Sequence, residues 1–232
     1  PLHFYSPRSI MSNANVEPIK IVLTGGPCGG KTTCMNALVE HFKAKGFRVF
    51  VVPEVPSILI SGGVDFAALD KDGFVRFENN LLSIQVAMEN TFIDLAKSSG
   101  GPAIVLCDRG TMDPAAYMDT EMWNTILAAQ NWTETALRDE RYDAVVHLVT
   151  TAIGAEKFYT TDNNEARKES PELAAELDRK VEKAWSAHRN HQVIDIQGVS
   201  ALDYFDLYRK FTYVNQEKYT LDHMAYVELG ER

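Results

Sequence analysis

The sequence has little that would place it outside the cell or in a membrane. Three of its 232 residues are cysteine, Cys28, Cys34 and Cys107, and they show no metal-ligand spacing. This low, odd number favours a reducing setting, and we expect a cytoplasmic protein. No apolar run approaches the roughly 20 residues that a transmembrane helix needs. No segment has the charged, apolar and small-residue order of a secretory signal.

The chain also lacks the basic excess that is typical of proteins that bind nucleic acid. Its formal net charge is −9, so we expect no nucleic-acid partner. Apolar residues make up 45% of the chain, enough for the core of one α/β domain. We expect a flexible leader over residues 1–18, the domain over residues 19–218 and a tail over residues 219–232.

What the chain does have is a glycine-rich segment at residues 25–33 that matches the pattern G-x-x-x-x-G-K-[ST]. Successive backbone amides of such a loop surround a phosphate, an approach that bulky side chains would block. The helix that follows adds its partial positive charge. The sequence therefore predicts a site for ATP or GTP formed by Gly25, Gly26, Pro27, Cys28, Gly29, Gly30, Lys31, Thr32 and Thr33.

Three side chains near this loop are predicted to act on the nucleotide. Lys31 would reach the β- and γ-phosphate oxygens, and the Thr32 hydroxyl would bind Mg²⁺. Asp108 ends a buried apolar run, the position of a second carboxylate at a Mg²⁺ site.

Strand and helix patterns alternate along the chain, which predicts a parallel sheet with helices on both faces. Ligands in such sheets lie beyond the carboxyl ends of the strands. Residues 55–74, with Gly62-Gly63 and an Asp70-to-Gly73 turn, are predicted to be a mobile connection. The expected strands are 19–24, 48–52, 103–107, 144–149 and 193–196, and the expected helices are 32–45, 75–97, 114–139, one that begins at Ser170-Pro171, and 201–218.

The helix after Ser170 has a capping serine followed by proline at its first position. Glu176 and Lys180 are predicted to pair on its exposed face. Its predicted buried face consists of Leu173, Leu177, Val181 and Trp185.

The residues after the second and third strands favour transfer to an acceptor over hydrolysis. Many hydrolytic ATPases place a glutamate directly after the strand-end aspartate, whereas this chain has Arg109, a cation suited to an anionic or hydroxylic acceptor. Glu54 would orient an acceptor hydroxyl or take its proton, or else be a solvated loop residue. Gln85 would bind the acceptor or simply lie on a helix surface.

A polar, basic segment at residues 154–170 is predicted to be a lid that contains Lys157, Arg167 and Lys168. Arg167 would meet the charge that develops on the transferred phosphoryl group. Arg179 is the competing candidate for this role.

With these residues together, the chain resembles the P-loop kinase-like domain shared by NadR-type ribosylnicotinamide kinases and TRPL-translocation-defect proteins. The resemblance covers roughly residues 18–200. It is carried by Gly25–Thr33, Glu54, Asp108-Arg109-Gly110 with Asp113, and the stretch Asn164–Arg167 through Asp178, Trp185 and His188.

The resemblance implies a three-layer P-loop NTPase fold with a five-stranded parallel sheet in the order 2-3-1-4-5. It implies that Lys31, Thr32 and Asp108 bind nucleotide and Mg²⁺, and that Arg167 is the lid arginine. We expect Glu54, Lys31, Asp108, Arg109 and Arg167 to serve catalysis. We expect the acceptor to contact Glu54, Gln85, Arg109 and Asp113.

Two functions follow as hypotheses. The first is a Mg²⁺-dependent small-molecule kinase that transfers the γ-phosphoryl group of ATP to a nucleoside- or nucleotide-like acceptor. The second is a GTP- or ATP-binding regulatory or trafficking module that contacts acidic phosphoinositide headgroups. The sequence leaves open the acceptor, the choice between ATP and GTP, the oligomeric state and whether a further domain follows.

Overall fold

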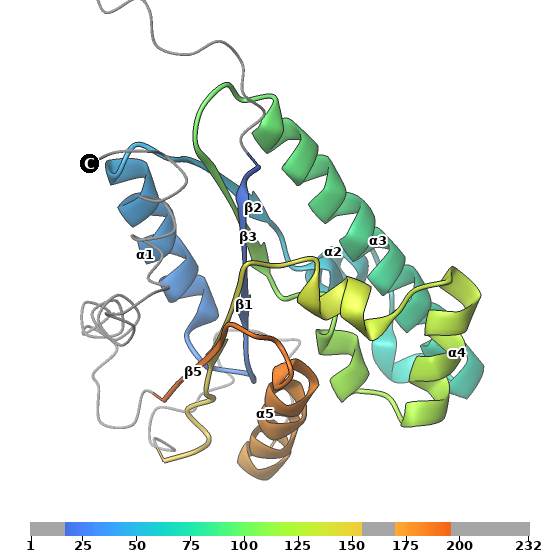
Figure 1. The fold of residues 1–232 in the computed structure, drawn as a ribbon. Coiled ribbons are helices and arrows are strands. Elements are labelled where there is room, and N and C mark those ends of the chain that lie inside the picture. Colours follow the sequence, from blue (N-terminus) through green and yellow to red (C-terminus); the bar gives the residue numbers. More distant parts are fainter. Residues whose placement is uncertain (1–16, 155–169, 196–232) are drawn as a thin grey trace, which may run out of the picture.

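A five-stranded parallel sheet forms the centre of the molecule (Figure 1). The computed structural model describes residues 17–154 and 170–195. The strand order is β2-β3-β1-β4-β5, and each neighbouring pair is parallel. The predicted fold class and strand order are therefore confirmed. The strands are β1 (Ile19–Thr24), β2 (Arg48–Val52), β3 (Ala103–Asp108), β4 (Ala144–Leu148) and β5 (His191–Ile194).

Helices connect the strands, as the alternating pattern predicted. The predicted helix at 114–139 is in fact three shorter elements, because Asn131 adopts a left-handed conformation at φ 54° and ends the middle one. The α-helices are α1 (Lys31–Ala44), α2 (Val55–Ser61), α3 (Lys71–Lys97), α4 (Thr120–Gln130) and α5 (Pro171–Trp185), and the short turns are η1 (Phe66–Ala68), η2 (Asp113–Ala116) and η3 (Thr135–Asp139).

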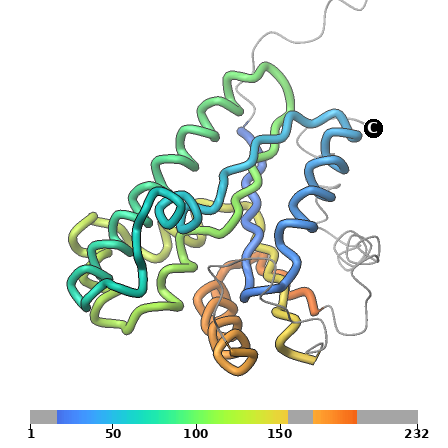
Figure 2. Tube along the Cα trace, turned by 180° about the vertical axis from the view of Figure 1, so that it is seen from behind, coloured from blue at the N-terminus to red at the C-terminus, as the bar shows by residue number. Residues whose placement is uncertain are grey.

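Both faces of the sheet are buried, and side chains that alternate along each strand fill two separate cores. In β1, Ile21 and Leu23 pack on the face covered by α1, whereas Val22 packs on the opposite face with α3, α4 and α5. Figures 1 and 2 show α1 on one side of the sheet and α3 on the other. This is the three-layer arrangement expected from the sequence.

The prediction of a mobile connection at residues 55–74 is wrong. This stretch holds α2, η1 and the first turn of α3. Val55 is fully buried and packs with Phe77 and Leu81 of α3 in a small third core. Asp70 caps α3, since its carboxylate accepts a hydrogen bond from the amide of Gly73 at 2.7 Å. The connection is thus ordered by its own apolar contacts.

The predicted start of α5 is confirmed, but its buried face is rotated. The Ser170 hydroxyl accepts a hydrogen bond from the Leu173 amide at 3.3 Å, and Lys180 pairs with Glu176 at 2.7 Å. Leu173 itself is 44% exposed, so its predicted burial is wrong. The buried stripe instead consists of Ala174, Ala175, Asp178, Val181 and Trp185. The rotation brings a carboxylate, that of Asp178, against the glycine-rich loop.

Several predicted features lie outside the described residues. They are most of the leader, the lid residues Lys157, Arg167 and Lys168, the helix at 201–218 and the tail. Of the helices that the structure describes, none combines the length and the apolar character that crossing a bilayer requires.

Candidate functional site

The glycine-rich loop lies at the carboxyl end of β1 and leads directly into α1. Gly25 has a φ of 128°, and a Cβ there would lie 2.0 Å from the carbonyl oxygen of Leu148 at the end of β4. A Cβ on Gly29 would lie 2.7 Å from the same oxygen. Only glycine therefore allows the loop to pass this close to β4, and this close passage shapes the turn that precedes α1.

Lys31, the first residue of α1, is buried and turned back into the loop. Its Nζ donates hydrogen bonds to the carbonyl oxygens of Gly25 at 3.0 Å and Gly26 at 2.7 Å. Burial and, after it, the neighbouring charge of Arg109 lower the pKa of Lys31 to about 7. The ammonium group is thus held at the loop by neutral carbonyls, which a phosphate oxygen can replace.

Thr32 and Asp108 offer oxygen ligands at the same end of the sheet. Thr32 is exposed in the first turn of α1, and Asp108 is the half-buried last residue of β3. Burial and, after it, the nearby charge of Glu54 raise the pKa of Asp108, and they outweigh the opposing charges of Lys31 and Arg109. A hydroxyl and a carboxylate are suitable ligands for Mg²⁺, which fits the metal that P-loop domains use.

Arg109 is held between two carboxylates. Its Nε donates to Glu54 Oε1 at 2.5 Å, and its Nη1 donates to Asp113 Oδ2 at 3.2 Å. Nη1 also lies 3.5 Å from the carbonyl oxygen of Gly25, which links it to the loop. The backbone of Arg109 has a φ of 68°, a strained conformation for a long side chain. Strain and paired charges together fix this guanidinium group at the edge of the loop.

Glu54 is a paired, ionised carboxylate and not a free loop residue. Burial acts to raise its pKa, but Arg109, a hydrogen bond from Ser57 and Lys31 outweigh burial and lower the pKa to about 2. In this state Glu54 is a weak base. It can accept a hydrogen bond from a hydroxyl group much more readily than it can remove the proton.

Asp113 and Gln85 lie behind Arg109. Asp113 is 2% exposed, and beside Arg109 it accepts hydrogen bonds from the Thr24 hydroxyl at 2.8 Å and from Trp185 Nε1 at 2.7 Å. Gln85 is also buried, which excludes the helix-surface alternative, and its Nε2 donates to the carbonyl oxygen of Arg109 at 3.3 Å. Both residues are therefore placed to orient Arg109.

Sequence reasoning missed the residues that support the loop from its other side. Asp178 Oδ1 accepts hydrogen bonds from the amides of Gly26 at 2.7 Å and Thr150 at 3.0 Å. The Thr150 hydroxyl donates to the carbonyl oxygen of Pro27, and that of Thr151 donates to Cys28 at 3.3 Å. One signal was available, since Asp178 lies three residues before Val181 and seven before Trp185 and so shares their buried face.

Of the two candidate lid cations, Arg179 is exposed on α5 and Arg167 lies outside the described residues.

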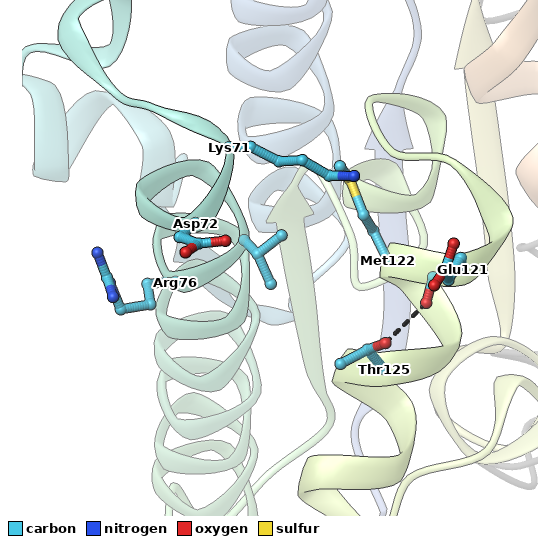
Figure 3. A pocket seen from close by; sticks show the side chains of 7 residues that line it. Lys71, Asp72, Arg76, Glu121, Met122 and Thr125 are labelled. Atoms are coloured by element: carbon cyan, nitrogen blue, oxygen red, sulfur yellow. Dashed lines mark hydrogen bonds between the residues drawn. The ribbon is translucent and has the colours of Figure 1, made fainter.

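A pocket of about 400 Å³ lies between the N-terminal parts of α3 and α4. In Figure 3, Lys71 and Met122 extend toward each other from these two helices. None of the predicted site residues lines the pocket, whose walls are Lys71, Asp72, Val75, Arg76, Glu121, Met122 and Thr125.

The loop, the sheet order and the strand-end carboxylate are the features of a P-loop NTPase. Comparison with known families agrees, since the AAA domain family matches residues 20–201. The chain belongs to the AAA domain family. The match includes every described strand and helix that forms the site, so this AAA domain is of the nucleotide- and Mg²⁺-binding P-loop type.

A second similarity of the AAA domain protein is local. A stretch of 41 residues is 44% identical to a DNA-directed DNA polymerase of Escherichia phage RB69. It covers 18% of this chain and 4% of the polymerase. A match to so small a part of the polymerase does not carry the polymerase activity over to this chain.

Proposed function

We propose that this AAA domain protein is a kinase that transfers the γ-phosphoryl group of ATP to a hydroxyl of a small, nucleoside- or nucleotide-like acceptor. The observation that carries the proposal is the ion-paired Arg109 beside the strand-end Asp108. A hydrolytic enzyme needs a group that activates water, whereas a fixed cation next to a carboxylate suits the binding of an acceptor.

The nucleotide half of the site consists of the loop amides and three side chains. When the triphosphate binds, Lys31 exchanges the carbonyls of Gly25 and Gly26 for phosphate oxygens. Thr32 and Asp108 would hold Mg²⁺, which would neutralise charge on the phosphates. This half binds and orients the phosphoryl donor.

The acceptor half consists of Glu54 and Arg109, supported by Gln85 and Asp113. Glu54 accepts the hydrogen bond of the acceptor hydroxyl and aims its oxygen at the γ-phosphorus. In a loose transition state the hydroxyl proton leaves late, so a carboxylate with a low pKa suffices. Most of the rate enhancement then comes from positioning and from charge neutralisation.

The resemblance to NadR-type ribosylnicotinamide kinases narrows the proposed acceptors to ribosides. In this proposal Arg167 supplies the lid cation, and the reaction takes place in the cytoplasm, where ATP is abundant.

Phosphoryl transfer from labelled ATP to nucleosides, ribosylnicotinamide and sugar phosphates tests the proposal. We expect one acceptor class to be labelled by the wild type, and Lys31→Ala to lower the rate roughly 100-fold. Lys43→Ala removes an exposed lysine of α1, which pairs with Glu40, and serves as the matched control. Equal background labelling by the wild type and Lys31→Ala on every acceptor would reject the proposal.

A second experiment distinguishes the regulatory alternative from the proposed kinase. The lysines and the arginine that would contact phosphoinositides, Lys157, Arg167 and Lys168, lie outside the described residues. Nucleotide-dependent sedimentation with phosphoinositide vesicles, combined with no transfer to any acceptor, would favour a regulator over a kinase.

A further inference from the structure

Three metal-ligand side chains meet on the side of β4 that faces α5, and the proposed phosphoryl transfer uses none of them. They are His147 of β4 and Asp178 and Glu182 of α5. One ligand atom from each lies within 4.8 Å of the other two. Asp178 and Glu182 are one helical turn apart, so both carboxylates lie on the same face of α5. The cluster borders the glycine-rich loop, because Asp178 Oδ1 accepts the hydrogen bond of the Gly26 amide.

Three buried polar atoms of this cluster have no hydrogen-bond partner among the described residues. His147 is 0% exposed and Asp178 is 1% exposed. Within residues 17–154 and 170–195, neither ring nitrogen of His147 has a partner, and Oδ2 of Asp178 has none either. His147 Nε2 lies 3.2 Å from Asp178 Oδ1, but without the geometry of a hydrogen bond. Buried groups in this state are costly, and a bound ion is one of the few arrangements that explains them.

Of the two carboxylate oxygens of Asp178, one accepts hydrogen bonds from described residues and the other accepts none, as in a carboxylate that binds a metal ion. Oδ1 accepts the amides of Gly26 and Thr150, which fixes the plane of the carboxylate. Oδ2 is buried and has no hydrogen-bond partner among the described residues, so it is the oxygen that is free to bind an ion. Outer hydrogen bonds of this kind orient the ligands of protein metal sites.

We propose that His147, Asp178 and Glu182 bind one divalent transition-metal ion of the Zn²⁺ type. One imidazole and two carboxylates form a mixed nitrogen and oxygen set that suits zinc better than Mg²⁺. The ion would fasten α5 to β4 and, through Asp178, hold the Gly26 amide in place. This site is distinct from the Mg²⁺ site at Thr32 and Asp108, and it does not depend on the proposed kinase activity.

Calorimetric titration of the chelator-treated full chain with ZnCl₂ alone, in buffer that contains Mg²⁺ and no nucleotide, tests the proposal. We expect one zinc ion per chain. Glu182→Gln, at a half-buried position, should weaken binding about tenfold or more. Glu176→Gln is the matched control, since it removes a carboxylate from the exposed face of the same helix and should leave zinc affinity unchanged. His147→Gln should also weaken binding.

Cobalt substitution identifies the ligands independently. With nitrogen and oxygen ligands, bound Co²⁺ shows visible d–d bands and no strong thiolate charge-transfer band in the near ultraviolet. A thiolate band would show that cysteines bind the metal and would overturn the assignment. No zinc binding by the folded wild type, or equal affinities of Glu182→Gln and Glu176→Gln, would also overturn it. His147 and Asp178 would then form only a buried contact between an imidazole and a carboxylate. Because no nucleotide is present, none of these results bears on the kinase proposal.

Discussion

The two halves of the candidate site hold their cations in different ways. In the nucleotide half, the hydrogen bonds that Lys31 Nζ donates to described residues go to the neutral carbonyls of the loop. In the acceptor half, Arg109 is bound by two carboxylates and has a strained backbone. A cation on neutral partners can move to an arriving phosphate, whereas one on charged partners stays in place. The comparison suggests that the nucleotide half reorganises on binding and that the acceptor half is already formed.

The largest expected effect comes from a substitution behind Arg109 in the acceptor half. Asp113→Ala removes the buried acceptor of Thr24, Trp185 and Arg109. We expect a loss of about 4 kcal/mol in the free energy of unfolding, because a buried cation and two donors lose their partner. Urea denaturation measures it, and the exposed Asp119→Ala is a control for loss of a carboxylate, with a smaller cost of about 1 kcal/mol for the lost cap of α4. Equal losses would show that the Asp113 network adds nothing.

The second prediction concerns the charge of Lys31, the cation of the nucleotide half. Its pKa is lowered to about 7 in the free protein, and a bound polyphosphate raises it again. Nucleotide binding between pH 7.5 and 9.5 should therefore take up a proton, and affinity should fall by up to about tenfold per pH unit as pH rises. Calorimetry in buffers of different ionisation enthalpy measures the uptake. The Lys31→Arg variant keeps its charge over this range, so its nucleotide affinity should change little with pH. Parallel pH profiles of the wild type and this variant would refute the explanation.

The third prediction separates the two halves directly. Glu54→Gln removes one of the two carboxylates of Arg109 and the proposed acceptor of the hydroxyl hydrogen bond. We expect kcat/KM for the phosphoryl acceptor to fall roughly tenfold, with nucleotide affinity unchanged within about twofold. The pKa of about 2 keeps Glu54 ionised, so no loss of activity down to about pH 4 should trace to this residue. A change in nucleotide affinity as large as the change in kcat/KM would show that the two halves do not act independently.

The smallest effect concerns the helix that supports the nucleotide half. Ser170→Ala removes the cap of α5 and should lower the free energy of unfolding by about 1 kcal/mol. Thermal or urea denaturation measures the loss. The kcat/KM for the acceptor should stay within about twofold of the wild-type value, because the cap lies at the opposite end of α5 from Trp185, which contacts Asp113. A roughly tenfold loss of kcat/KM would contradict the separation of the two halves.

Much of the fold was predictable because its signals are local. β1 and β2 end where their apolar runs end, and the cap at Ser170 starts α5 as predicted. Residues 55–74 were misjudged because the glycines suggested a loop, whereas Val55 is ordered by contacts with Phe77 and Leu81 of α3. Leu173 was misjudged because hydrophobicity alone cannot show which of two adjacent stripes faces the sheet.

The sequence by itself determined the glycine-rich loop, the alternation of strands and helices and the polar residues at the strand ends. These depend on backbone freedom, on side-chain periodicity and on short-range capping, which neighbouring residues decide. Only the tertiary structure decided which residues far apart in the sequence contact each other. Glu54 and Arg109 are 55 positions apart, and Gly26 and Asp178 are 152 apart. Such contacts depend on how the sheet and its helices pack, which no local pattern encodes.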